Sequence, residues 1–288
     1  MYLEHARAPE YTAAAEVVRV AQAHIRHAMG LLAILVCTAF PCVAPCVHAE
    51  QEVDAANALF QRAVEAFDAG DMPAVIEAWT EALDAYRSIP GTERQQADCC
   101  RKLGRPLVDV GRVEESMARQ QEALGIYNDI PGAEAEQGEC HKSIGIALDQ
   151  MGRYQEAIAE YEEGLRILRS ASGTEREQGK CYANMGNALE SMEEYEQALT
   201  RYREALAAFE RGGGTAKERG YCYLKMGDGL REMARYEEAL TNYEEALALV
   251  ESIPGTEREQ GACHFDMGEA LREMRRYEEA LAKYEEAL

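Results

Sequence analysis

The sequence has few of the residues that build catalytic and metal sites. After residue 49 only two histidines remain, His141 and His264. Each directly follows a cysteine, so on a helix the two neighbouring side chains point about 100° apart and cannot share one ligand. No Cys-x-x-Cys or His-Glu-x-x-His motif, the usual spacings of zinc ligands, occurs in the chain. We therefore predict no catalytic residue, no metal ligand and no cofactor, and we expect the protein not to be an enzyme.

Proline and positive charge are also scarce. The 288 residues include 8 prolines, and Glu, Ala and Leu dominate, which favours helix. The formal net charge is −22, and all of it falls on residues 50–288, because three glutamates and three arginines cancel in residues 1–49. A surface of this sign repels nucleic acid and anionic lipid. We expect a protein or peptide partner, with neither nucleic acid nor a small-molecule substrate.

Long hydrophobic runs are absent except for one near the amino terminus. Residues 28–40 form an uncharged apolar stretch of 13 residues, whereas a membrane-spanning helix needs about 20. Two arginines precede this stretch, and Val47-His48-Ala49 offers a small-residue cleavage site after it. These parts together indicate a secretory signal. We expect residues 1–49 to be the leader of an exported protein, periplasmic or secreted, and the alternative is an uncleaved signal that anchors the chain in a membrane.

The remainder of the chain repeats itself at a constant step. Cysteines recur at Cys99, Cys140, Cys181, Cys222 and Cys263, glycines at Gly104, Gly145, Gly186, Gly227 and Gly268, and tyrosines at Tyr154, Tyr195, Tyr236 and Tyr277. A diverged unit at 55–90 continues the register backwards, and the last unit is incomplete, which gives about six units in residues 50–288. Periodicity of this length indicates a stacked array of similar structural units.

Each unit is predicted to form two helices. In residues 174–211, apolar or small residues follow steps of three and four in two stretches that Glu193-Glu194 separates. Thr174 and Glu177 have the spacing of a capping box at the start of the first stretch. The register predicts first helices at 92–109, 133–151, 174–192, 215–233 and 256–274, and each second helix should begin within two or three residues.

The recurring cysteines are expected to be buried and reduced. Neighbouring helices in a stacked array lie about 10 Å apart, whereas a disulfide requires Cα atoms within about 7 Å. Equivalent cysteines of successive units therefore should not pair. Their most common role in such a position is that of a small apolar core residue.

The spacing of the small and aromatic residues resembles the tetratricopeptide repeat family. The motif runs Met185-Gly186-x-x-Leu189, then Tyr195-x-x-Ala198, then Tyr202-x-x-Ala205. The usual unit of that family has about 34 residues, and the longer unit here is similar to the subclass found in kinesin light chains and cell-polarity adaptors. The resemblance covers about residues 55–288. It implies an all-α, right-handed superhelical solenoid of about six helical hairpins.

The same resemblance implies a function. Members of the family are protein-interaction scaffolds or adaptors that hold a peptide or protein in a concave groove lined by the first helices. The alternative function is a structural spacer or self-assembling module of a larger complex. Groove-facing positions here carry mainly basic and amide side chains, namely Arg101, Lys102, Arg105, Lys142, Lys180, Asn184, Asn187, Lys225 and Arg231.

Three of these groove positions match part of a known binding site of the family. Lys142, Asn184 and Lys225 correspond to part of the carboxylate clamp with which chaperone-binding members hold a C-terminal carboxylate. Ile146 and Tyr221 stand where the clamp has Asn and Lys. A general groove for acidic or extended peptides and an ordinary solvated surface are the alternatives. Glutamate pairs on the second helices offer a further possibility, an acidic outer surface for a basic partner.

Two parts of the array depart from the pattern. In the unit at 92–131, Pro106 falls within the first helix and is expected to kink it, while Ser116 and Gln120 replace an alanine and an aromatic residue. The final helix carries an apolar stripe that includes Tyr277 and Leu281. Solenoid units bury this stripe against the next unit. The alternatives are a truncated gene product, pairing with a second copy and fraying of this helix, and we expect weak self-association of residues 50–288 through it.

Overall fold

The computed structural model describes residues 44–251 and 253–288, and within them every element of regular structure is an α-helix. The elements are α2 (Ala44–Asp68), α3 (Met72–Arg87), α4 (Glu93–Asp109), α5 (Val113–Tyr127), α6 (Glu134–Gln150), α7 (Tyr154–Leu168), α8 (Glu175–Ser191), α9 (Tyr195–Arg211), α10 (Ala216–Glu232), α11 (Tyr236–Val250), α12 (Glu257–Glu273) and α13 (Tyr277–Glu286). They form six hairpins, from α2–α3 to α12–α13. The predicted all-α solenoid of hairpins is confirmed.

The predicted helix positions are also confirmed. Helices α4, α6, α8, α10 and α12 are the expected first helices, and both ends of each lie within one residue of the prediction. Three residues separate each of them from its second helix. Helix α4 continues through Pro106 to Asp109, so the proline does not end it.

The amino-terminal predictions are largely outside the described residues. The apolar stretch at 28–40 lies there, and export stays a prediction. Helix α2 begins at Ala44, ahead of the predicted boundary at residue 50. None of the described helices combines the length and apolar character that crossing a bilayer requires.

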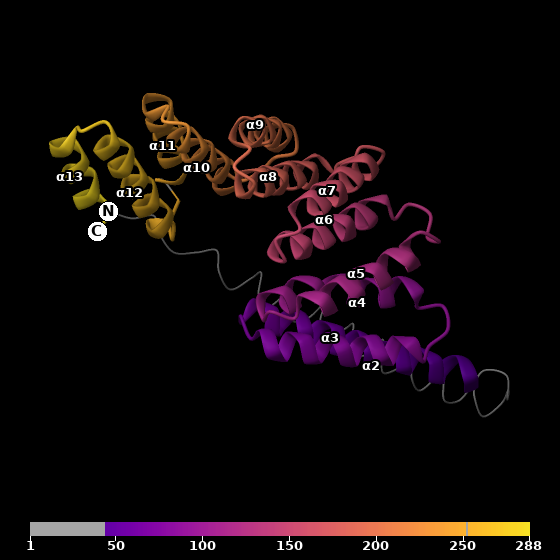
Figure 1. Cartoon of the computed structure of the whole chain (residues 1–288). Helices are drawn as coiled ribbons and strands as arrows, with labels where there is room; N and C mark the ends of the chain where they lie inside the picture. The colour runs from indigo at the N-terminus through magenta and orange to yellow at the C-terminus, as the bar shows by residue number, and fades with distance from the viewer. Residues whose placement is uncertain (1–43, 252) are drawn as a thin grey trace, which may run out of the picture.

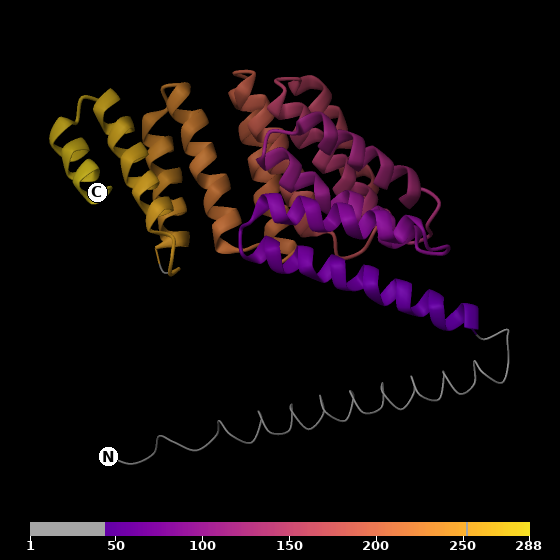
Figure 2. The ribbon, with the colours of Figure 1, turned by 90° about the horizontal axis from the view of Figure 1, so that it is seen from below.

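The hairpins follow one another along a curved path. Figure 1 shows this path from α2 and α3 at one end to α12 and α13 at the other, and Figure 2 shows the helices of the last hairpins side by side along it. The first helices of neighbouring hairpins contact each other. The contacting pairs are α4–α6, α6–α8, α8–α10 and α10–α12. We therefore take the surface that the first helices share to be the inner, concave face.

A glycine on the first helix faces an aromatic ring on the second helix in most hairpins. A Cβ atom at Gly186 would lie 2.5 Å from Cε1 of Tyr202, a distance that real Cβ atoms do not adopt. The pairs Gly145–Tyr161, Gly227–Tyr243 and Gly268–Tyr284 have the same arrangement. The rings of Tyr161, Tyr202 and Tyr243 are almost completely buried. The glycine therefore admits the ring, and the ring fills the space between the two helices.

The second hairpin replaces this apolar contact with hydrogen bonds. Gln120 occupies the ring position beside Gly104 and donates from Nε2 to the Arg101 carbonyl at 2.8 Å. Ser116 donates its hydroxyl to the Gly104 carbonyl at 2.9 Å. Both side chains are fully buried. The two polar replacements are tolerated in the core because each finds a backbone acceptor on α4.

One residue in the turn of every hairpin has left-handed backbone geometry. The position recurs once in each unit as Gly70 (φ 77°), Gly111 (φ 79°), Gly152 (φ 72°), Glu193 (φ 61°), Ala234 (φ 57°) and Arg275 (φ 60°). Glycine adopts this conformation freely, whereas other residues lose about 1–2 kcal/mol in it. The turns of the last three hairpins are therefore strained where those of the first three are not.

The capping box predicted at Thr174 is wrong. The Thr174 hydroxyl donates to the carbonyls of Leu168 and Ala171, at 2.6 and 3.1 Å, and accepts a hydrogen bond from Nε2 of Gln178 at 3.1 Å, but it accepts none from a backbone N–H of α8. The backbone of Thr174 (φ −104°, ψ 7°) lacks the extended geometry of an N-cap residue. The capping box instead forms in the following unit, between Thr215 and Glu218.

The recurring cysteines are buried in the core, as expected, and each has a free thiol. Burial raises the pKa of Cys140, Cys181 and Cys222 to about 12 and that of Cys263 to about 11. Only the thiolate is an effective nucleophile. These cysteines are therefore protonated and shielded at neutral pH.

The glycine–ring contact predicts that Gly186→Ala destabilises the array. The added methyl group collides with the Tyr202 ring, and overpacking of this kind lowers the free energy of unfolding by about 1–3 kcal/mol. The control is Gly125→Ala in α5, where a Cβ atom meets nothing within 4 Å. This change should instead stabilise the helix by about 0.5–1 kcal/mol. Urea denaturation followed by circular dichroism measures both, and equal stability of Gly186→Ala and the parent chain would refute the role of the contact.

The burial of the thiols predicts their chemical behaviour. In the folded chain without reductant, iodoacetamide should leave Cys140, Cys181, Cys222 and Cys263 unmodified, and in urea it should modify all four. Peptide mass spectrometry reports each site separately. Recovery of any pair of them as a disulfide-linked peptide would contradict the stacking arrangement.

Candidate interaction groove

Ion pairs join the first helices of neighbouring hairpins. Arg94 on α4 reaches Glu136 on α6 at 2.6 Å, and Arg176 on α8 reaches Glu218 on α10 at 3.0 Å. In both pairs the acid lies 42 residues after the base. Lys217 on α10 pairs with Glu259 on α12 at the same two repeat positions. Partly exposed pairs contribute about 0–1 kcal/mol each.

In one unit the basic residue of this series is missing, and lysines from other positions pair with the acid instead. Ala135 stands where the other units have a basic residue, which leaves Glu177 without an arginine partner. Glu177 instead pairs with Lys142 and, at 2.6 Å, with Lys180. Burial alone would raise the pKa of Glu177, but the two ammonium groups outweigh it and lower the pKa below its ordinary value. Lys142 and Lys180 are therefore already neutralised.

Two of the three predicted groove residues on α4 form ion pairs, and the third is exposed. Arg101 pairs with Glu139 on α6, and Arg105 pairs with Asp109 at 2.7 Å on its own helix. Lys102 is exposed. These three residues and Lys142 line neither of the clefts described below. The sequence indicated a basic face, and the structure corrects this, because carboxylates from neighbouring hairpins compensate most of the positive charge.

The groove is hollowed between α8 and α10. The first cleft, of about 450 Å³, is lined by Asn187, Glu190, Ser191, Tyr195, Tyr221, Lys225, Asp228, Arg231 and Glu232, and we call it the polar cleft. The second, of about 390 Å³, is lined by Arg176, Lys180, Ala183, Asn184, Phe209, Thr215, Lys217, Glu218 and Tyr221, and we call it the apolar cleft. The apolar cleft lies at the amino-terminal ends of α8 and α10, and the polar cleft lies towards their carboxyl-terminal ends.

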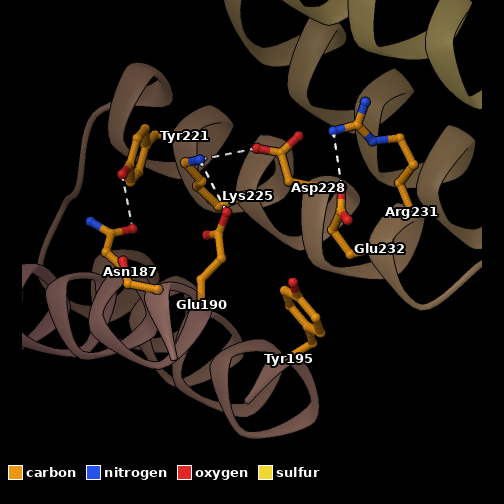
Figure 3. Close-up of a pocket in the computed structure, with 9 residues that line it drawn as sticks. Asn187, Glu190, Tyr195, Tyr221, Lys225, Asp228, Arg231 and Glu232 are labelled. Carbon is orange, nitrogen blue, oxygen red and sulfur yellow. Dashed lines mark hydrogen bonds and ion pairs between the residues drawn. The ribbon is translucent and has the colours of Figure 1, made fainter. Parts of the chain in front are cut away.

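Tyr221 belongs to both clefts and marks the boundary between them. Its side chain is 40% exposed. Its hydroxyl donates to Oδ1 of Asn187 at 2.9 Å (Figure 3). The buried Tyr202 donates to the same oxygen at 2.8 Å. Two donors from different hairpins thus fix one amide, and the ring of Tyr221 is held as a partly exposed apolar surface.

Lys225 lies at the centre of the polar cleft between two carboxylates (Figure 3). Its ammonium group is 3.0 Å from Asp228 and 3.4 Å from Glu190. Burial would lower the pKa of Lys225, but the two acids outweigh it and raise the pKa above its ordinary value. The lysine is charged and its charge is balanced. A peptide carboxylate would have to displace these acids, so the engagement of Lys142 and Lys225 argues against a carboxylate clamp.

Arg231 is the least satisfied cation of the polar cleft. Its terminal nitrogen Nη2 is 3.4 Å from Glu232, and its Nε atom is buried without a hydrogen-bond partner. Buried polar groups of this kind are rare and need a partner. Glu232, in turn, is 52% exposed, and among the described residues its carboxylate makes only this long contact. The carboxylate of Glu232 is therefore accessible to another molecule.

Two carboxylates lie near Arg231, Asp228 on α10 and Asp266 on α12. Burial and the nearby charge of Asp228 raise the pKa of Asp266 to about 6. Asp228 also accepts a hydrogen bond from the buried Tyr243 at 3.1 Å. This end of the groove is therefore acidic.

The structure brings five of the nine predicted groove residues together. Lys180 and Asn184 line the apolar cleft, and Asn187, Lys225 and Arg231 line the polar one. Sequence reasoning did not select Tyr221, Phe209 or Ala183 as binding residues. Comparison of repeat positions would have indicated Ala183, because the other units carry a long side chain there. Across residues 44–251 and 253–288, no cluster of three or more potential metal ligands occurs.

Solved structures with a similar fold support this architecture. BtubC (BKLC) from P. vanneervenii is 18% identical with a TM-score of 0.66, over 75% of this chain and 89% of that one. Aspartyl phosphate phosphatase F from Bacillus subtilis is 14% identical with a TM-score of 0.62, over 80% of this chain and 68% of that one. A Rap protein complexed with Competence and Sporulation Factor is 15% identical with a TM-score of 0.61, over 80% and 72%. At these identities the likeness shows the fold alone.

Sequence comparison identifies the family. No curated protein matches the chain. The family model described as Tetratricopeptide repeat matches residues 103–170, 141–211 and 221–288, which together make up more than half of the chain. The matched segments include all the residues that line the polar cleft and most of those that line the apolar cleft. The chain therefore belongs to the tetratricopeptide repeat family.

Proposed function

We propose that the chain is a non-catalytic scaffold that binds an extended segment of another protein in the groove between α8 and α10. The observation that carries this proposal is the alignment of two clefts along the same pair of helices, with Tyr221 between them. A segment that runs along the groove can place consecutive side chains in both clefts. A globular ligand could reach only their rims.

The groove is suited to such a ligand because it is pre-formed. Helix α8 contacts α10 directly, and Asn187 fixes the orientation of Tyr221. A surface that is already ordered loses little conformational freedom on binding, which leaves more of the contact energy as affinity. The Rap protein of similar fold that is complexed with Competence and Sporulation Factor supports a binding role for this architecture.

The proposal predicts that Tyr221→Ala weakens peptide binding. A phage-displayed library of random linear peptides should yield ligands for the chain, and loss of the ring should weaken them about tenfold or more, since aromatic residues at the centre of an interface contribute about 2 kcal/mol or more. Arg203→Ala is the control, because Arg203 is exposed on α9 and lines neither cleft. Ligands whose affinity falls with Arg203→Ala and not with Tyr221→Ala would place binding on the outer face.

Self-association is a second candidate function, favoured by the surface of α12 and α13. Leu281 is 59% exposed, whereas Leu199, which occupies the same repeat position in α9, is 1% exposed. Tyr277, one helical turn before Leu281 on α13, is 62% exposed. In the interior of the array this stripe is covered by the first helix of the next hairpin. We propose that a second copy of the chain covers it, with low affinity.

This candidate predicts a concentration-dependent dimer that Leu281→Glu abolishes. The substitution places a charge in the centre of the apolar stripe, and desolvating an unpaired charge opposes association. Sedimentation velocity over a wide concentration range measures the effect. Glu251→Gln on the outside of the array is the control. A parent chain that remains monomeric at the highest concentration would exclude the second candidate without affecting the first.

A further inference from the structure

The apolar cleft exists because one side chain of the repeat is missing. The position occupied by Ala183 in α8 carries Arg101, Lys142, Leu224 and Phe265 in the other units. Each of those side chains is long enough to extend across the groove beside it. The methyl group of Ala183 does not, and the space is left as a cleft between α8, α9 and α10. The walls are mainly apolar, with Phe209 and Tyr221 contributing aromatic rings.

Basic side chains outnumber acidic ones among the residues that line the apolar cleft. Arg176, Lys180 and Lys217 surround it, with side chains that are 46%, 35% and 61% exposed, and Glu218 is the acid among its lining residues. Each of these cations has one carboxylate partner, but exposed pairs of this kind exchange readily because their net stability is small. The cleft also lies at the amino-terminal ends of α8 and α10, where the helix dipole favours anions.

The polar cleft has the opposite sign. Its lining holds three carboxylates, Glu190, Asp228 and Glu232, against the two cations Lys225 and Arg231. It lies near the carboxyl-terminal ends of α8 and α10, where the helix dipole favours cations. Figure 3 shows Glu232 beside Arg231 at one edge of this cleft, apart from the group around Lys225. Glu232 is the carboxylate with the fewest contacts of its own.

We infer that the natural ligand is a segment with three features in a fixed order: a carboxylate, an apolar side chain of leucine to phenylalanine size, and a basic side chain. This inference rests on the proposed function. The apolar side chain occupies the space beside Ala183 and Phe209. The carboxylate meets Arg176 and Lys217, and the basic side chain passes Tyr221 and meets Glu232. The charge gradient along the groove thus selects one orientation of the ligand.

The first part of the test uses synthetic peptides with blocked termini and a fluorescent label. One has the order Glu-Glu-Phe-Gly-Lys-Lys and another reverses this order, and each is also made with Phe replaced by Ser. All four peptides have the same net charge. The order of the charged residues and the presence of the apolar side chain are therefore varied separately. Fluorescence anisotropy should show that one order binds the chain better than the other. Replacement of Phe by Ser should weaken the better order about tenfold, the value expected from burial of one large apolar side chain.

The second part uses variants of the chain. Ala183→Leu fills the apolar cleft with the residue that α10 already carries at the equivalent position, so the fold should persist, as circular dichroism will verify. It should weaken the Phe peptide about tenfold, because the space for one large apolar side chain is lost. The same substitution at the exposed Ala248 of α11 is the matched control and should have no effect. Glu232→Lys should reduce the preference between the two peptide orders.

The outcomes separate this inference from the proposed function. Equal binding of the Phe and Ser peptides, or unchanged binding by Ala183→Leu, would overturn the apolar anchor. Equal binding of the two orders, or an order preference that survives Glu232→Lys, would overturn the charge gradient. In each of these cases a groove that still responds to Tyr221→Ala leaves the proposed function intact. If no synthetic peptide binds and the random library yields no groove ligand, both proposals fail.

Discussion

A contact between a glycine and a tyrosine ring sets the distance between the two helices of most hairpins. Because Gly186 has no side chain, the Tyr202 ring lies in the space that a Cβ atom would occupy. The hydroxyl of the same tyrosine then reaches Asn187 and Glu190 on the groove side, both at 2.8 Å. The core contact therefore orients two residues of the polar cleft. Packing inside the hairpin and the shape of the groove are two consequences of the same residue pair.

Much of the fold could be predicted from the sequence because the array repeats. A constant step shared by cysteines, glycines and tyrosines fixes the register of every unit, and local periodicity then fixes both helices. Contacts in a solenoid are made between neighbouring units, so the fold does not depend on pairing between segments that are far apart in the sequence. The capping-box prediction failed because residue spacing does not determine backbone geometry. Thr174 has the right spacing, but its backbone (φ −104°, ψ 7°) lacks the extended N-cap geometry that Thr215 has.

The groove was harder to predict because its electrostatics depend on how successive hairpins are placed. Lys142 and Lys225 look like free cations when each helix is considered alone. Their partners, Glu177 and Glu190, come from the neighbouring first helix, 35 residues away in the chain. The cleft beside Ala183 likewise results from the lack of a long side chain in one unit. The spacing of apolar residues within that unit alone does not predict this cleft. Comparison between units, position by position, is the signal that carries this information.

The strained turns give the array a gradient of local stability. Glycine supplies the left-handed residue in the first three hairpins, whereas Glu193, Ala234 and Arg275 must be held in that conformation by their surroundings. Local opening releases this strain, so it should begin at these turns more readily than at the glycine turns. Two of them, at Glu193 and Ala234, adjoin cleft residues, since Ser191 and Tyr195 flank one and Glu232 precedes the other. A molecule bound in the polar cleft contacts residues beside both turns, so its binding should raise the free energy of local opening in this region.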